Sequence, residues 1–207
     1  MDRFENCIAA FEHSISRARE MIKLFDALSL IRPTAVNDDA LRAAYFQAVS
    51  SFDYYVHEIV AIEANYRFAN CIRTRNIHIP MEIYIINDPE ERLNAVNAFV
   101  REKNSYKAFV DPSKLAEILS CFVEDPWERI ASEYLIDQPE GPEKSGLKAQ
   151  LKSIWSRRNK IAHEADVNPT LSGVTLWPME KSDTEMTIVF LVSIGRTLPT
   201  VISAELR

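Results

Sequence analysis

Glycine is scarce in this sequence. Only four of the 207 residues are glycine, and the first of them is Gly141. Phosphate-binding loops and dinucleotide fingerprints depend on closely spaced glycines, so the first two thirds of the chain cannot hold such a loop. The same scarcity is typical of long helices that are joined by few turns.

Cysteine is also rare, and its positions are dispersed. Cys7, Cys71 and Cys121 lie far apart, which argues against a disulfide framework and against a zinc site. The first residues, MDRFE, lack the apolar core of a signal peptide. The longest late apolar run, residues 188–194, is too short to cross a membrane. We therefore expect a cytoplasmic protein that uses no membrane, no metal and no other cofactor.

The chain lacks an excess of basic residues. Its net charge is −6, whereas proteins that coat nucleic acids are usually basic. The hydrophobic share of 47% and the charged share of 26% are those of an ordinary soluble globular protein. Any contact with RNA or DNA must therefore be confined to a local surface.

Helical periodicity is what the sequence has in abundance. Apolar residues recur at helical spacing over residues 3–30, and again in a long segment after the cluster at residues 37–39. The second stripe alternates steps of three and four, which suits lengthwise packing in a helical bundle. Its members are Leu41, Tyr45, Ala48, Phe52, Tyr55, Ile59, Ile62 and Tyr66.

The middle of the chain predicts a series of shorter helices. Residues 77–86 alternate like a strand, but Pro80 interrupts them, and we interpret them as a loop that enters a short helix. Three Asp-Pro pairs then begin helices, the first of them at Pro89. Residues 137–146 contain two prolines and two glycines and form the clearest linker.

The last part of the chain predicts two more helices with a loop between them, and this loop could contain a short strand. The second of these helices should open with a capping box from Ser182 to Glu185, and Pro199 should kink it. We therefore predict an all-α fold, a single helical bundle over residues 1–207. An inserted set of short helices at approximately 78–140 should separate its two halves.

The strongest local charge feature is the helix predicted at residues 145–164. From residue 144 to residue 163 the chain carries six cations and no carboxylate. Such a basic face attracts a polyanion. The alternative is a solvated face, or one that is paired with acids of a neighbouring helix. The six cations are Lys144, Lys148, Lys152, Arg157, Arg158 and Lys160.

Helical geometry divides this segment into two faces. The apolar stripe consists of Leu147, Leu151, Ile154, Ile161 and Ala162. The adjacent polar face consists of Lys148, Lys152, Ser156, Asn159, Lys160 and His163. Arg158 points into the apolar stripe, and Trp155 lies on the boundary between the faces. A charge in an apolar stripe needs a partner, either a carboxylate of another helix or a polar pocket at an interface with a second subunit.

The stretch RRNKIAHEAD, residues 157–166, resembles the motif of the HEPN superfamily. That motif is an arginine, four to six further residues and a histidine, often with a polar residue after the arginine. Arg158, Asn159 and His163 match it with four intervening residues. The position of the motif, late in the chain after a long helix and an insertion, looks most like the RiboL-PSP-HEPN branch. A second match, Arg73 to His78, lacks an asparagine directly after its arginine and lies in the ambiguous segment before Pro80, so we set it aside.

The resemblance implies a HEPN-like bundle that forms a homodimer, with the two motifs meeting across a two-fold axis. It also implies a metal-independent endoribonuclease in which the RNA 2′-hydroxyl attacks the adjacent phosphate. His163 would then be the acid/base and Arg158 the phosphate clamp, with Asn159 orienting them. The residues that would bind the RNA strand are Arg157, Lys160 and Lys152. The family analogy adds a role as a toxin or antiviral effector, with an antitoxin or other regulatory partner.

Two further interpretations stay open at this point. The chain could be a non-catalytic dimeric module that binds RNA or a partner protein, which the acidic net charge favours and the intact motif does not. It could also be a purely structural bundle whose basic face is paired internally. Asp53 and His57, four residues apart, could assist a site, but we interpret them as part of a polar helix face.

Overall fold

The computed structural model describes residues 2–32, 34–171 and 175–204. These residues form eight α-helices and two short 3-10 turns, and they contain no strand. The prediction of an all-α fold is confirmed. The helices are α1 (Glu5–Ile31), α2 (Asp38–Ala69), α3 (Met81–Tyr84), α4 (Pro89–Asn104), α5 (Pro112–Leu119), α6 (Pro126–Asp137), α7 (Lys144–His163) and α8 (Lys181–Ile202).

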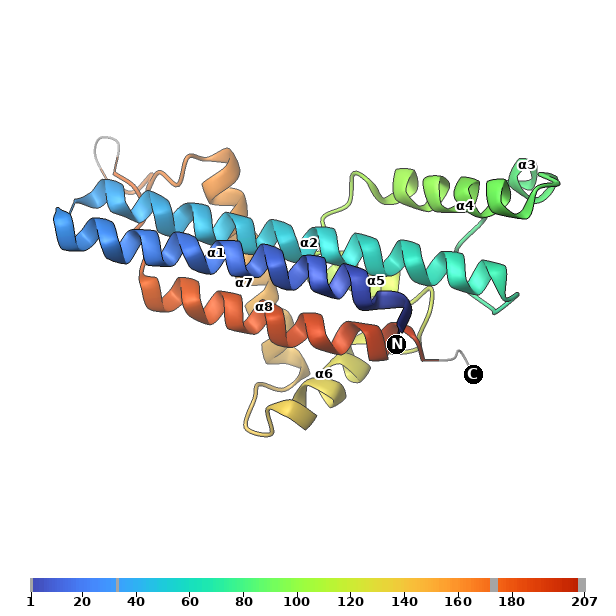
Figure 1. The fold of residues 1–207 in the computed structure, drawn as a ribbon. Helices are drawn as coiled ribbons and strands as arrows, with labels where there is room; N and C mark the ends of the chain where they lie inside the picture. The colour runs from blue at the N-terminus through green and yellow to red at the C-terminus, as the bar shows by residue number, and fades with distance from the viewer. Residues whose placement is uncertain (1, 33, 172–174, 205–207) are drawn as a thin grey trace.

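Three long helices form the body of the bundle (Figure 1). Helices α1 and α2 are an antiparallel pair, and α8 runs alongside α2. Each buries one apolar stripe against the others, as an amphipathic helix does when burial drives folding. The predicted stripe of α2 is buried from Leu41 to Ile59. The buried residues of α1 are Cys7, Phe11, Ile15, Ala18 and Ile22.

A glycine in the middle of α8 allows this helix to approach an aromatic pair. The rings of Phe11 and Tyr55 stack with their centroids 4.5 Å apart, and a Cβ atom at Gly195 would lie 2.9 Å from the Phe11 ring. The Tyr55 hydroxyl donates a hydrogen bond of 3.3 Å to the Gly195 carbonyl. Pro199 has no N–H to bond that carbonyl, so Tyr55 replaces a bond that the helix loses. The predicted kink at Pro199 stays a prediction.

Charged side chains end the apolar stripe of α2. Tyr66, predicted to be buried, is 40% exposed, whereas Glu63 and Arg67 are 1% and 2% exposed. Arg67 donates to Glu63 at 2.7 Å and to the backbone carbonyl of Ile202 at 2.9 Å. Arg3 also donates to Glu63, at 2.6 Å. A buried ion pair therefore connects the two ends of the described chain to α2, and the sequence stripe was wrong at this turn.

Helix α8 is the central apolar element of the bundle. Its length and composition would allow it to cross a membrane, but 67% of its most apolar stretch is buried inside the fold, as in the core helix of a soluble protein. The predicted capping box is wrong, because the helix begins at Lys181 with Glu180 at its N-cap and no side-chain cap. Ser182 consequently lies within the first turn.

The short helices predicted for the middle of the chain are present. Helix α3 follows Pro80, and α4, α5 and α6 each begin at the proline of an Asp-Pro pair. Asp88 and Asp111 accept hydrogen bonds of 2.8 Å from the backbone N–H groups of Glu91 and Ser113. Helix α4 lies along the second half of α2, and α6 packs against α8 (Figure 1). The boundaries of an insertion at approximately 78–140 stay a prediction.

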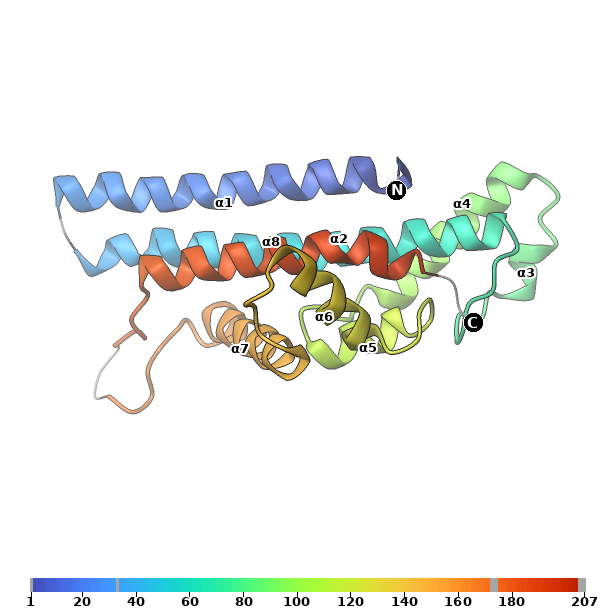
Figure 2. The ribbon, with the colours of Figure 1, turned by 90° about the horizontal axis from the view of Figure 1, so that it is seen from below.

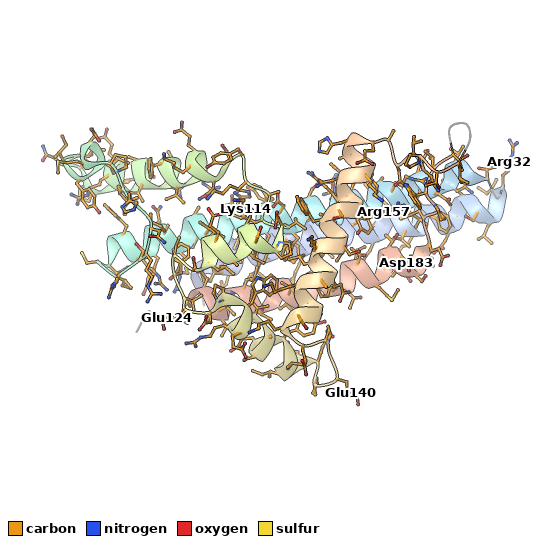
Figure 3. All side chains as sticks on the ribbon, turned by 180° about the vertical axis from the view of Figure 1, so that it is seen from behind. Arg32, Lys114, Glu124, Glu140, Arg157 and Asp183 are labelled. Carbon is orange, nitrogen blue, oxygen red and sulfur yellow. The ribbon has the colours of Figure 1, made fainter. Side chains whose placement is uncertain are left out.

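Helix α7 crosses the long helices at a steep angle (Figure 3). It packs on the side of α2 that faces away from α1, next to α5 and α6 (Figure 2). The last turns of α7 are thereby placed against the first half of α2. This crossing positions every residue of the candidate site.

Candidate functional site

The apolar stripe of α7 changes its exposure along the helix. Leu147, Leu151 and Ile154 are buried, as the helical spacing of these residues predicts. Towards the end of the helix Ile161 is only partly buried and Ala162 is exposed. The side of α7 that is buried in the bundle at the start of the helix is therefore exposed near the end of the helix, where the Arg158–His163 motif lies.

Arg158 lies against α2 at this point. Its guanidinium carbon is 5.2 Å from the centre of the Phe46 ring, and its Nη1 donates to Asn159 Oδ1 at 3.2 Å. The side chain is partly buried, yet no carboxylate in residues 2–32, 34–171 and 175–204 forms an ion pair with it. A guanidinium without a carboxylate partner can still bind an anion through its remaining N–H groups.

His163 is the last residue of α7 and is exposed. It follows Arg158 by five residues, which corresponds to about 140° around the helix axis and about 7.5 Å along it. Asn159 lies between the two in direction, one turn before His163. The three motif residues thus form a row around the end of the helix, and Arg158 and His163 of one chain point in different directions.

Arg157 has a structural partner. Its Nη1 and Nη2 lie 2.8 and 2.9 Å from the two carboxylate oxygens of Asp166, and Nη2 also donates to the Pro178 carbonyl at 3.1 Å. Asp166 is 1% exposed, and its Oδ2 also accepts a hydrogen bond of 2.8 Å from Arg42 Nε on α2. The guanidinium of Arg157 is therefore already engaged within the protein. Its role in binding RNA stays a prediction.

The turn that follows His163 brings Asp166 into that ion pair. Ala165 and Asp166 both have left-handed backbones, with φ of 47° and 56°. The Lys160 carbonyl accepts hydrogen bonds of 3.0 Å from the N–H groups of both Glu164 and Asp166. The sequence does not indicate that Asp166 and Arg42 form an ion pair. An acid just after a basic helix is only a weak signal for such a pair, and Arg42 lies 124 residues before Asp166.

The basic face of α7 is only partly neutralised. Lys144 pairs with Glu128 of α6 at 2.6 Å, and Arg157 pairs with Asp166. Lys160 places its Nζ 4.7 Å from the centre of the Trp177 ring, and Lys152 is exposed. In the part of the chain that the structure describes, the cations of this helix without an ion pair are Lys148, Lys152, Arg158 and Lys160. Ion pairs within the protein therefore neutralise two of the six cations of this face.

Comparison with known proteins bears directly on this motif. The sequence model of the RiboL-PSP-HEPN family matches residues 12–186, a range that contains all of α2 to α7. The chain belongs to the RiboL-PSP-HEPN family. The predicted family membership is thereby confirmed. No curated protein and no solved structure matches the chain.

The second Arg-x4-His match of this HEPN chain lies in a different setting. Arg73 and His78 are both exposed, and they belong to the segment between α2 and α3. The backbone carbonyl of Arg73 accepts a hydrogen bond of 3.1 Å from Arg67. No helix fixes the two side chains relative to each other, in contrast to Arg158 and His163 on α7. The described residues also contain no group of three or more acidic, histidine or cysteine side chains placed to hold a metal ion.

Asp53 and His57 hold a loop of the RiboL-PSP-HEPN fold. Asp53 Oδ1 accepts hydrogen bonds from the backbone N–H groups of Phe109 and Val110 at 2.6 and 3.3 Å. His57 Nε2 lies 3.1 Å from the Lys107 carbonyl oxygen. Burial raises the pKa of Asp53, against the opposing effect of the nearby His57. Both side chains thus face the loop before α5, which fits their interpretation as a polar face against a neighbour.

We expect Asp53→Asn and Asp53→Ala to differ in stability. Alanine leaves two backbone N–H groups without an acceptor and should cost about 1–3 kcal/mol at neutral pH. Asparagine keeps an acceptor oxygen without the charge that burial penalises, so it should be at least as stable as the wild type. Because the folded carboxyl has the raised pKa, its contribution is fully present at low pH and is lost as the pH rises.

Denaturant unfolding of the three proteins at several values between about pH 4 and pH 8 measures both effects. The loss of stability with rising pH that Asp53 causes should be absent in Asp53→Asn. If Asp53→Asn instead loses as much stability as Asp53→Ala, then the charge of Asp53 holds the loop and its role as a neutral acceptor is wrong.

Proposed function

We propose that this chain is a metal-independent endoribonuclease of the HEPN type that acts as a homodimer. The observation that carries the proposal is the state of Arg158. It is partly buried, forms no ion pair in the described chain, and lies on the same helix end as the exposed His163. Such an arginine is suited to a phosphate that arrives from outside the protein.

The proposed reaction is a transesterification within the RNA strand. His163 accepts the proton of the 2′-hydroxyl as its oxygen forms a bond to the adjacent phosphorus. The bond from phosphorus to the 5′-oxygen breaks, and a protonated imidazole donates a proton to that oxygen. Arg158 donates hydrogen bonds to the non-bridging oxygens as negative charge develops on them. The products are a 2′,3′-cyclic phosphate and a 5′-hydroxyl end.

A second subunit answers two needs of this site. Each turnover requires one neutral and one protonated imidazole, and a two-fold axis at the end of α7 would supply two copies of His163. Within one chain Arg158 and His163 point about 140° apart, so a partner chain would also complete the surroundings of the phosphate. The exposed Ala162 and the Phe46 ring, which is 37% exposed, offer apolar surface beside Arg158 for this contact.

The test is cleavage of a single-stranded RNA by the purified protein in excess chelator. We expect wild type to produce 2′,3′-cyclic phosphate ends and His163→Ala to produce none above background. His78→Ala is the matched control, since it removes the histidine of the other Arg-x4-His match and should cleave like wild type. Equal activity of His163→Ala and wild type, or activity that depends on added metal, would contradict the proposal.

A second candidate is a non-catalytic dimeric module that binds RNA or a partner protein. The net charge of −6 favours this second candidate. An acidic protein repels RNA over most of its surface, so any attraction is confined to the basic face of α7. Binding of RNA without cleavage in the same experiment would identify this function. The role of toxin or antiviral effector, silenced by an antitoxin or other regulatory partner, is proposed on the family resemblance alone.

A further inference from the structure

Helices α5 and α7 form the walls of an open groove with a volume of about 610 Å³. Figure 3 shows the two helices next to each other, with Lys114 marking α5 and Arg157 marking the later part of α7. We call it the α5–α7 groove. Lys148, Lys152 and Trp155 line it on the side of α7, and Asp111, Pro112 and Ser113 line it on the other side.

The two walls differ in charge. Lys148 and Lys152 are exposed and form no ion pair with any residue that the structure describes. On the opposite wall the Asp111 carboxylate accepts hydrogen bonds from the Ser113 N–H and hydroxyl groups at 2.8 and 2.6 Å. A phosphate is therefore attracted to the α7 wall and repelled from the α5 wall. Trp155, partly buried, adds an aromatic surface to the cationic wall.

The groove continues the line of the Arg158–His163 motif. At 100° per residue, Lys148, Lys152 and Trp155 lie on the same side of α7 as Asn159. Along the axis, Trp155 is about 6 Å from Asn159, and Lys148 is about 16 Å from it. A stacked strand advances about 3.4 Å per nucleotide, so the groove starts about two nucleotides from the motif and spans about three more.

We propose that the α5–α7 groove is a subsite for single-stranded RNA, in which Lys148 and Lys152 contact phosphates and Trp155 stacks on a base. This inference rests on the proposed function, because it concerns the strand that continues from the motif. Base stacking on an aromatic ring requires an unpaired base, so the groove selects single strands. Lysine and tryptophan contacts read no base edge, so it recognises length rather than sequence.

Binding is measured by fluorescence anisotropy on the His163→Ala chain, which removes the proposed acid/base, with labelled RNA hexamers and dinucleotides. We expect Trp155→Leu to weaken hexamer binding by about 5- to 100-fold and Trp155→Phe to restore most of it. Lys148→Gln with Lys152→Gln should weaken it too and lower its dependence on salt. Dinucleotide binding should not change. Lys23→Gln, on α1, is the matched lysine control.

The outcomes separate this inference from the proposed function. Weaker hexamer binding with unchanged dinucleotide binding supports the groove, even if wild type proves not to cleave RNA. His163-dependent cleavage with normal hexamer binding in both sets of groove variants overturns the groove and leaves the nuclease. Equal losses for hexamer and dinucleotide also overturn it, because they would place the effect at the motif. The double lysine variant tests the groove without altering core packing at Trp155.

Discussion

Replacing Arg158 with alanine is expected to lower the rate constant for RNA cleavage by about 10²–10³-fold, the effect of removing one charged donor from a developing oxyanion. The fold should survive the change. Arg158 contacts the Phe46 ring and Asn159 but closes no ion pair in the described chain, so the loss of stability should be about 1 kcal/mol. A large kinetic effect with a small stability effect distinguishes a residue that binds phosphate from one that supports packing.

Arg158→Lys refines this expectation. Lysine keeps the charge but not the planar pair of donors that matches two phosphate oxygens, so its rate constant should lie between those of wild type and Arg158→Ala. Single-turnover cleavage with excess protein measures the chemical step, and denaturant unfolding measures stability. Arg73→Ala is the matched control from the other Arg-x4-His match. A rate constant for Arg158→Ala within about threefold of wild type would exclude the phosphate clamp.

Most of the fold could be predicted because its signals are local. The stripe from Leu41 to Ile59 and the Asp-Pro starts of α4 and α5 depend on residues within a few turns of one another. The family motif is local as well, since six consecutive residues carry it. Helical geometry likewise directs Arg158 and His163 to different sides of α7, and the structure places Arg158 against α2 and leaves His163 exposed.

Local patterns could not show what lies opposite a side chain. The apolar stripe of α2 appeared to continue through Tyr66, but Glu63 and Arg67 are buried there because both chain ends meet this turn. Arg157 and Arg158 are neighbours with the same side chain, and only the tertiary structure assigns one to Asp166 and the other to Phe46. The α5–α7 groove likewise needs two helices that the sequence places 24 residues apart.

The ion pairs of Asp166 give the largest stability effect that we expect. Asp166 is 1% exposed and lies within 2.9 Å of both Arg42 and Arg157. Removing a buried partner leaves uncompensated charges behind, so Asp166→Ala should lower the free energy of unfolding by about 3–5 kcal/mol. Part of that loss, about 1 kcal/mol, should come from the left-handed backbone, which alanine tolerates poorly.

Asp166→Asn separates the two contributions, because asparagine tolerates a left-handed backbone but carries no charge. It should lose less stability than Asp166→Ala and more than Glu164→Ala, the matched control. Glu164 is an exposed carboxylate two residues earlier, and its replacement should change stability by no more than about 0.5 kcal/mol. Urea unfolding measures the three free energies of unfolding. They can be compared when the slope of the free energy against urea concentration is the same in all variants. If Asp166→Asn and Glu164→Ala unfold at the same midpoint, the ion pairs with Arg42 and Arg157 do not hold the turn after His163, and Arg157 is then available to bind RNA.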